Sequence, residues 1–96
     1  MNQSERQLLD SLVNEAEELV IREMQRQVAR YPEMCTCDEC VLDIAAYALN
    51  KVKPRYRVSL LDTVYQDRQE RSAYAREIEE AVAEAIRTVR ANPSHD

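Results

Sequence analysis

Apolar side chains recur at steps of three and four through the first third of the chain. The stripe that they form comprises Leu8, Leu9, Leu12, Val13, Ala16, Leu19, Val20, Met24 and Val28. Ser4-Glu5-Arg6-Gln7 precedes the stripe and has the form of a capping box, so we expect an amphipathic helix from about residue 4 to about residue 30. Asn14-Glu15-Ala16-Glu17 also resembles a helix start, and a break near residues 12–14 is the alternative. We expect the stripe to form core or a dimer seam.

A second apolar segment follows the Tyr31-Pro32 step, which ends the first helix. Its apolar residues are Val41, Leu42, Ile44, Ala45, Ala48, Leu49 and Val52. They cover more than one helical face, so we predict a helix at the buried centre of the protein, capped by Asp38 and stopped by Lys53-Pro54. Residues 55–66 alternate only in part, and we assign them to a loop with room for one short strand.

The last third of the chain returns to helical periodicity, from about Gln66 to Asn92-Pro93. The residues on its apolar face are Tyr74, Ile78, Ala81, Val82, Ala85, Ile86 and Val89. The fold class that we predict is therefore all-α, mostly helical, with three main helices. The 96 residues form a single domain, residues 1–96, whose small core would benefit from a metal or a second copy of the chain.

Composition and charge exclude several function classes. The chain has no Gly, so it contains neither a GxGxxG motif nor a Walker A loop. Its net charge of -5 argues against duplex DNA binding. It has no apolar run long enough to cross a bilayer and a polar start at Met1–Asp10, so we expect a cytoplasmic protein without a membrane partner.

All three cysteines lie within six residues, as Cys35, Cys37 and Cys40 in a CxCxxC motif. Three cysteines cannot all pair within one chain, which favours a metal over disulfides. Cys37 and Cys40 are three residues apart at a helix start, where the helix dipole favours the thiolate form, and Cys35 approaches from the preceding loop. Zinc is the metal that best fits such a sulfur-rich set.

A tetrahedral zinc site needs a fourth ligand, and His95 is the only histidine in the chain. A zinc ion that bound His95 would attach the C-terminus to the central helix. A water molecule, a carboxylate of Asp38 or Glu39, or a residue from a second chain are the alternatives. The motif has no carboxylate pair or second histidine for acid–base chemistry beside it, so we predict a structural metal and a protein that is not an enzyme.

A cluster of basic residues surrounds Pro54 in this otherwise acidic chain. Lys51, Lys53, Arg55 and Arg57 alternate along it, with Tyr47, Asn50 and Tyr56 nearby. Arginine pairs with phosphate oxygens and stacks on bases, so these residue types are the ones that a small anionic nucleotide requires. The alternative is a solvated basic run that complements the dipole of the preceding helix.

Residues 35–56 resemble one protein family. Cys35-Thr36-Cys37, Cys40, the segment from Asp43 to Asn50, and Pro54-Arg55-Tyr56 are similar to the signature of the late competence development ComFB family. The resemblance implies a small, mostly helical bacterial protein of the cytoplasm that forms zinc-stabilised homodimers. It further implies a receptor for cyclic dinucleotides that acts through a downstream protein in motility, surface behaviour or competence. Members of the Bacillus type carry a fourth cysteine late in the chain, where this sequence has His95.

The resemblance assigns zinc to Cys35, Cys37 and Cys40. We call the cluster of basic residues around Pro54 the basic turn and assign binding of cyclic di-GMP or cyclic di-AMP to it. The candidate ligand-binding residues are Asn50, Lys53, Arg55, Tyr56 and Arg57. A ligand with two equivalent phosphates and bases fits two copies of one patch across a dimer axis. Two alternatives remain: an interaction module without a small ligand, and a thiol or metal sensor.

Overall fold

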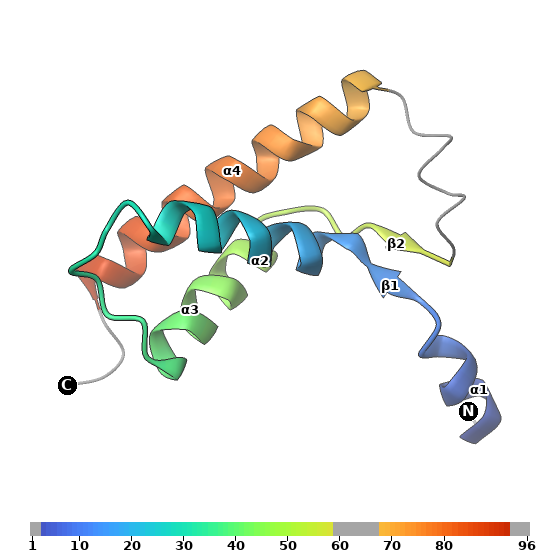
Figure 1. Cartoon of the computed structure of the whole chain (residues 1–96). Helices are drawn as coiled ribbons and strands as arrows, with labels where there is room; N and C mark the ends of the chain where they lie inside the picture. The colour runs from blue at the N-terminus through green and yellow to red at the C-terminus, as the bar shows by residue number, and fades with distance from the viewer. Residues whose placement is uncertain (1–2, 59–67, 93–96) are drawn as a thin grey trace.

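The computed structural model describes residues 3–58 and 68–92. Its elements are α1 (Gln3–Leu9), β1 (Val13–Asn14), α2 (Glu15–Val28), α3 (Asp38–Leu49), β2 (Tyr56–Arg57) and α4 (Arg68–Ala91). Helices α2 and α3 pack against α4 and form the body, while α1 extends from one end of it (Figure 1). The predicted mostly helical fold class is confirmed. The short strand β2 lies within residues 55–66, which were predicted to form a loop that could contain one short strand.

The first apolar stripe does not form one continuous helix. α1 ends at Leu9, where the N–H groups of Ser11 and Leu12 donate to the carbonyls of Leu8 and Leu9 at 3.1 and 3.0 Å. The chain then passes through β1 before α2 begins at Glu15. The continuous helix over residues 4–30 was therefore wrong, and the alternative break near residues 12–14 was right.

Asn14 holds the start of α2 to the segment that follows α3. Its side-chain Oδ1 accepts hydrogen bonds from the N–H of Ala16 at 3.2 Å and from the N–H of Arg55 at 2.9 Å. Strands β1 and β2 pair antiparallel, with Asn14 opposite Tyr56, and the N–H of Glu15 donates to the Arg55 carbonyl at 2.6 Å. One residue thus caps a helix and joins two segments that are distant in sequence.

Asn14→Ala is expected to lower the free energy of unfolding by about 1–2 kcal/mol, because a part-buried acceptor of two backbone N–H groups is lost. Asn14→Asp is the matched control, since a carboxylate can accept from both donors and suits a helix N-terminus. Urea denaturation of both variants measures the difference. Equal destabilisation by alanine and aspartate would contradict the bridging role.

The core lies where one stripe from each of α2, α3 and α4 meets the others. Its buried residues are Ala16, Val20, Met24, Cys40, Ile44, Ala48, Val52, Tyr74, Ile78, Ala81, Val82, Ala85, Ile86 and Val89. The four alanines allow the helix backbones to approach closely. The buried Gln27 amide donates to the Glu79 carbonyl at 2.9 Å and to the Glu23 carboxylate at 2.6 Å, so its polar group is satisfied inside the core.

The second helix departs from its prediction in three respects. α3 ends at Leu49 rather than at Lys53, and its N-cap is Cys37 rather than Asp38. Val41 and Leu42 are exposed, so α3 is not buried all round. Among the described residues, the elements that pack extensively on α3 are α2 and α4, and these two neighbours leave Val41 and Leu42 exposed.

The third predicted helix is confirmed as α4, which begins at Arg68 and ends at Ala91. Its apolar face spans both other helices of the body, and its remaining face carries charged residues. Within residues 3–58 and 68–92, none of the helices combines the length and the apolarity needed to cross a membrane.

Candidate metal centre and basic turn

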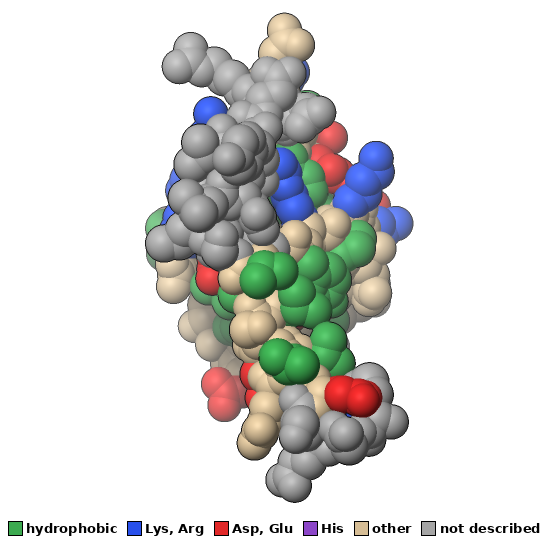
Figure 2. All heavy atoms as spheres, turned by 90° about the vertical axis from the view of Figure 1, so that its right-hand side faces the viewer, with side chains coloured by type: hydrophobic (Ala, Val, Ile, Leu, Met, Phe, Trp, Pro, Cys, Tyr) green, Lys and Arg blue, Asp and Glu red, His purple; other side chains and the backbone are tan. Residues whose placement is uncertain are grey.

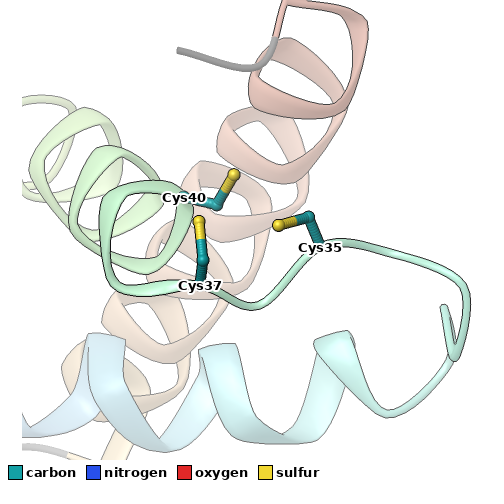
Figure 3. A group of neighbouring side chains, drawn as sticks. All are labelled: Cys35, Cys37 and Cys40. Carbon is teal, nitrogen blue, oxygen red and sulfur yellow. The ribbon is translucent and has the colours of Figure 1, made fainter. Parts of the chain in front are cut away.

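The three cysteines converge at the start of α3. Cys35 lies in the connection from α2, Cys37 is the N-cap of α3, and Cys40 lies in its first turn. Their side chains point toward one another (Figure 3), and the three Sγ atoms lie within 4.8 Å of one another. Cys40 is buried, whereas Cys35 and Cys37 are exposed. The predicted cysteine cluster is thus assembled by the fold.

The connection that carries Cys35 is held against α4. The guanidinium carbon of Arg90 lies 4.4 Å from the ring centroid of Tyr31, and the N–H of Met34 donates to the Tyr31 carbonyl at 3.0 Å. On the other side of the cluster, the N–H of Val41 donates to the Cys37 carbonyl at 3.0 Å and begins α3. Both ends of the motif are therefore anchored before any ion binds.

The arrangement fits a tetrahedral metal with sulfur ligands. Zn–S bonds of about 2.3 Å place the sulfurs of a tetrahedral site about 3.8 Å apart. The observed limit of 4.8 Å requires only small side-chain rotations to reach that spacing. Zinc, which prefers thiolates and tetrahedral geometry, would be held by Cys35, Cys37 and Cys40 and would cross-link the connection to α3.

The protonation state of the Cys40 thiol depends on whether such a cation is bound. Burial is the largest cause that raises the pKa of the Cys40 thiol, which reaches about 12, and hydrogen bonding with Cys37 and Cys35 adds to it. Without a nearby cation, Cys40 is therefore a neutral thiol at physiological pH. A metal must displace this proton, so metal affinity is expected to weaken as the pH falls.

A cavity of about 240 Å³ borders the cysteine cluster. Glu33, Met34, Val89 and Arg90 line it together with Cys35 and Cys40. Asp38 and Glu39 do not belong to the cluster of potential ligands found in the described part of the chain. His95, the predicted fourth ligand, lies outside the described residues, five positions after Arg90. Five extended residues span about 16 Å, so chain length allows His95 to reach this cavity.

The basic turn after α3 is tied to the start of α4. The Tyr74 hydroxyl donates to the Lys53 carbonyl at 2.6 Å, and the N–H of Lys53 donates to a Glu77 carboxylate oxygen at 3.2 Å. Burial raises the pKa of the Tyr74 phenol, so that it remains a neutral donor at physiological pH. The backbone at residue 53 is thus held in place, while the Lys53 residue remains exposed.

Arg55 lies between an aromatic ring and a carboxylate. Its guanidinium carbon is 4.9 Å from the Tyr74 ring centroid, and its Nε is 3.9 Å from Oε2 of Glu15. That Glu15 oxygen is buried and makes no hydrogen bond. The contact between Arg55 and Glu15 is therefore a loose ion pair, and an anion with better geometry could compete with it for Arg55.

Two of the five predicted ligand residues share one groove. Lys53 and Arg55 line a groove of about 410 Å³ together with Tyr74. Asn50 is instead the exposed C-cap of α3, and Tyr56 is exposed on β2, so neither lines this groove. Arg57 also belongs to β2, and its side chain is not among those described.

Sequence reasoning missed the two side chains that flank Arg55. Tyr74 was assigned to the apolar face of the last helix, and Glu15 to a helix start. The sequence held one indication of a polar role for Tyr74, because the hydroxyl of a buried tyrosine needs a hydrogen-bond partner. Its partner lies 21 positions away, and the sequence does not specify such a pairing.

Fold and site together define a small helical protein with a cluster of three cysteines that could hold a metal ion at the start of α3, and a basic groove beyond the end of α3. Residues 13–93 match the family described as late competence development protein ComFB, and the chain belongs to this family. A solved structure of the late competence protein ComFB from Bacillus subtilis is similar, with 27% sequence identity and a TM-score of 0.68. The match covers 86% of this chain and 92% of that chain. Among curated proteins, no match to this chain was found.

Proposed function

We propose that this member of the ComFB family is a non-enzymatic receptor for a cyclic dinucleotide, cyclic di-GMP or cyclic di-AMP, and regulates a downstream protein. The observation that carries the proposal is the groove in which Lys53 and Arg55 lie beside the Tyr74 ring. It combines two cations with an aromatic face in a protein whose net charge is -5. Cationic side chains can bind phosphate oxygens, and an aromatic ring can stack on a base, so this combination suits a nucleotide.

Each group in the groove has a distinct role in the proposal. Lys53, which is exposed, supplies a mobile charge for a phosphate oxygen. Arg55 is already oriented by its stack on Tyr74, so less side-chain entropy is lost when it binds a phosphate. Glu15 lies on the other side of Arg55 and disfavours anions, so the ligand must supply more than a single weak phosphate contact.

A second copy of the chain would complete the site. Cyclic dinucleotides present two phosphates and two bases related by symmetry, and a twofold homodimer offers two equivalent Lys53–Arg55 pairs. Asn50 and Tyr56 do not line the groove that the structure describes, and the side chain of Arg57 is not described. We propose that these three residues contact the ligand from the rim of the groove or across the dimer axis.

Zinc is the proposed cofactor, with a structural role. Cys35, Cys37 and Cys40 supply three ligands, and we propose His95 as the fourth because the last turn of α4 borders the cysteine cavity. A closed site with four ligands stabilises a fold and leaves no position for catalysis. The expected location of the protein is the cytoplasm, where thiols remain reduced.

Lys53→Gln tests the site, and Lys51→Gln is its matched control. Lys51 belongs to the same turn and is exposed, but its ammonium lies 5.5 Å from the Tyr47 ring centroid and it does not line the groove. Loss of a charge-assisted phosphate contact is expected to weaken cyclic di-GMP or cyclic di-AMP binding by about 10–100-fold for Lys53→Gln. Anisotropy of a fluorescent cyclic dinucleotide measures both variants. Equal affinities would remove Lys53 from the site.

A further inference from the structure

A small cavity adjoins the basic groove. It measures about 160 Å³ and shares Arg55 and Tyr74 with the groove as lining residues. Glu15, at the start of α2, and Arg71, near the start of α4, also line it. Figure 2 views the end of the molecule at which β1 pairs with β2, and Lys and Arg side chains (blue) lie there with Asp and Glu side chains (red) among them. The cavity thus brings together one carboxylate and two guanidinium groups.

The Glu15 carboxylate is held in this cavity by one loose contact. Its Oε2 is buried and makes no hydrogen bond, and the nearest charge that pairs with it is the Arg55 Nε at 3.9 Å. A phosphate that binds Arg55 would neutralise that charge. A buried carboxylate oxygen that loses its only cation costs free energy. Phosphate binding at Arg55 therefore requires a second cation for Glu15.

Arg71 is in the position to supply this second cation. It is exposed, and none of the ion pairs or side-chain hydrogen bonds found in residues 3–58 and 68–92 engages its guanidinium. It lines the same small cavity as Glu15, whereas Lys53 lines only the groove. The arginine side chain has several rotatable bonds and a planar fork that pairs with a carboxylate in two hydrogen bonds.

We propose that Arg71 is a positioning residue of the nucleotide site, and that the Glu15 carboxylate exchanges Arg55 for Arg71 when a phosphate binds Arg55. The inference rests on the proposed function, because the phosphate is that of the cyclic dinucleotide. The exchange keeps Glu15 paired and leaves the guanidinium of Arg55 free for the ligand. It also joins the start of α4 to the start of α2, so the occupied site differs from the empty one in the contact between two helices.

A double-mutant cycle between Glu15 and Arg71 tests the exchange through nucleotide affinity. Arg71→Gln is expected to weaken binding of fluorescent cyclic di-GMP or cyclic di-AMP by about 3–10-fold, because Glu15 then has no cation other than Arg55. In the Glu15→Gln background the same substitution is expected to change the affinity by less than about 1.5-fold. Weakening of equal size in both backgrounds would mean that Arg71 contacts the ligand directly and would overturn the exchange. No weakening in either background would also overturn it.

Two further variants separate the role of Arg71 from a general effect of charge. Arg71→Lys retains a cation in the cavity and is expected to restore most of the affinity that Arg71→Gln loses. Arg76→Gln is the matched control, because Arg76 is an exposed arginine of the same helix that lines neither the groove nor the small cavity. It is expected to bind the nucleotide like the wild-type protein. A loss in Arg76→Gln as large as that in Arg71→Gln would overturn the assignment.

Urea denaturation of the full chain tests the same exchange without nucleotide. Arg55→Ala removes the first partner of Glu15, as a bound phosphate would. In that background Arg71→Gln is expected to lower the urea midpoint by at least about 0.5 M, because the buried carboxylate loses its second partner. In the presence of Arg55 the shift is expected to be below about 0.2 M, the size of a weak surface contact. Equal shifts in both backgrounds would contradict the exchange.

The two measurements distinguish failure of the exchange from failure of the receptor proposal. Coupled urea midpoints in a protein that binds neither cyclic di-GMP nor cyclic di-AMP would support the ion-pair exchange and refute the receptor. Nucleotide binding that is weakened by Arg55→Ala but is independent of Arg71, with uncoupled urea midpoints, would support the receptor and refute the exchange.

Discussion

Cys35→Ala is expected to reduce the bound zinc from about one ion per chain to almost none. Cys35 is exposed, so loss of its side chain leaves no cavity in the core and any destabilisation reports on the metal. The two remaining thiols do not provide the ligand set that a structural zinc site needs. Because metal binding is coupled to folding, the free energy of unfolding is expected to fall by several kcal/mol. Elemental analysis and thermal denaturation measure the two effects.

Cys35→His is the matched control for this prediction, because imidazole is also a zinc ligand. It is expected to retain the ion, while Cys35→Ala does not. A chelator should lower the thermal midpoint of the wild-type protein and leave that of Cys35→Ala unchanged. If the alanine variant retains a full complement of zinc, Cys35 is not a ligand and the convergence of the three sulfurs has another cause.

Arg55→Ala is expected to weaken cyclic dinucleotide binding by about 100-fold, since a guanidinium that is oriented by an aromatic stack is lost. Stability should fall by only about 1 kcal/mol, because the lost contacts are one cation–π interaction and one loose ion pair. Arg55→Lys keeps the charge but loses the planar fork, and an intermediate affinity is expected. Calorimetry and urea denaturation measure affinity and stability separately.

Glu15→Gln is expected to tighten cyclic dinucleotide binding, whereas Arg55→Ala is expected to weaken it. Oε2 of Glu15 lies 3.9 Å from the Arg55 Nε and makes no hydrogen bond, so this carboxylate competes with a phosphate while gaining little itself. Its removal should tighten nucleotide binding by about 3–10-fold, which corresponds to a weak ion pair. Weaker binding in Glu15→Gln, or unchanged binding in Arg55→Ala, would place the phosphate elsewhere.

Apolar periodicity was sufficient where an element packs along its whole length. The face of α4 from Tyr74 to Val89 is buried as predicted, because α2 and α3 cover it. Periodicity did not predict the exposure of Leu8, Leu9 and Leu12, whose spacing continues the apolar stripe of Ala16 and Val20. Asn14 caps a new helix and changes the direction of the chain, so these three leucines lie outside the core although their spacing fits the stripe.

The two parts of the candidate site differed in how far the sequence could predict them. The cysteines are local, and the spacing of Cys35, Cys37 and Cys40 brought them together with one helix start. The basic groove is not local, since Tyr74 and Glu15 reach Arg55 from distant helices. Because Asn50, Lys53 and Arg55 are close in sequence, they had the same predicted role, although of these three only Lys53 and Arg55 line the groove.

Calorimetric titration of the metal-loaded protein with cyclic di-GMP and cyclic di-AMP tests the receptor proposal most directly. Linear pGpG and AMP are the controls, because they carry the same chemical groups without the cyclic geometry. The account predicts micromolar or tighter binding of a cyclic ligand, at one per two chains, with much weaker binding of the linear controls. No binding of either cyclic ligand, established also by an orthogonal method, would contradict it and would favour an interaction module that acts through its surface alone.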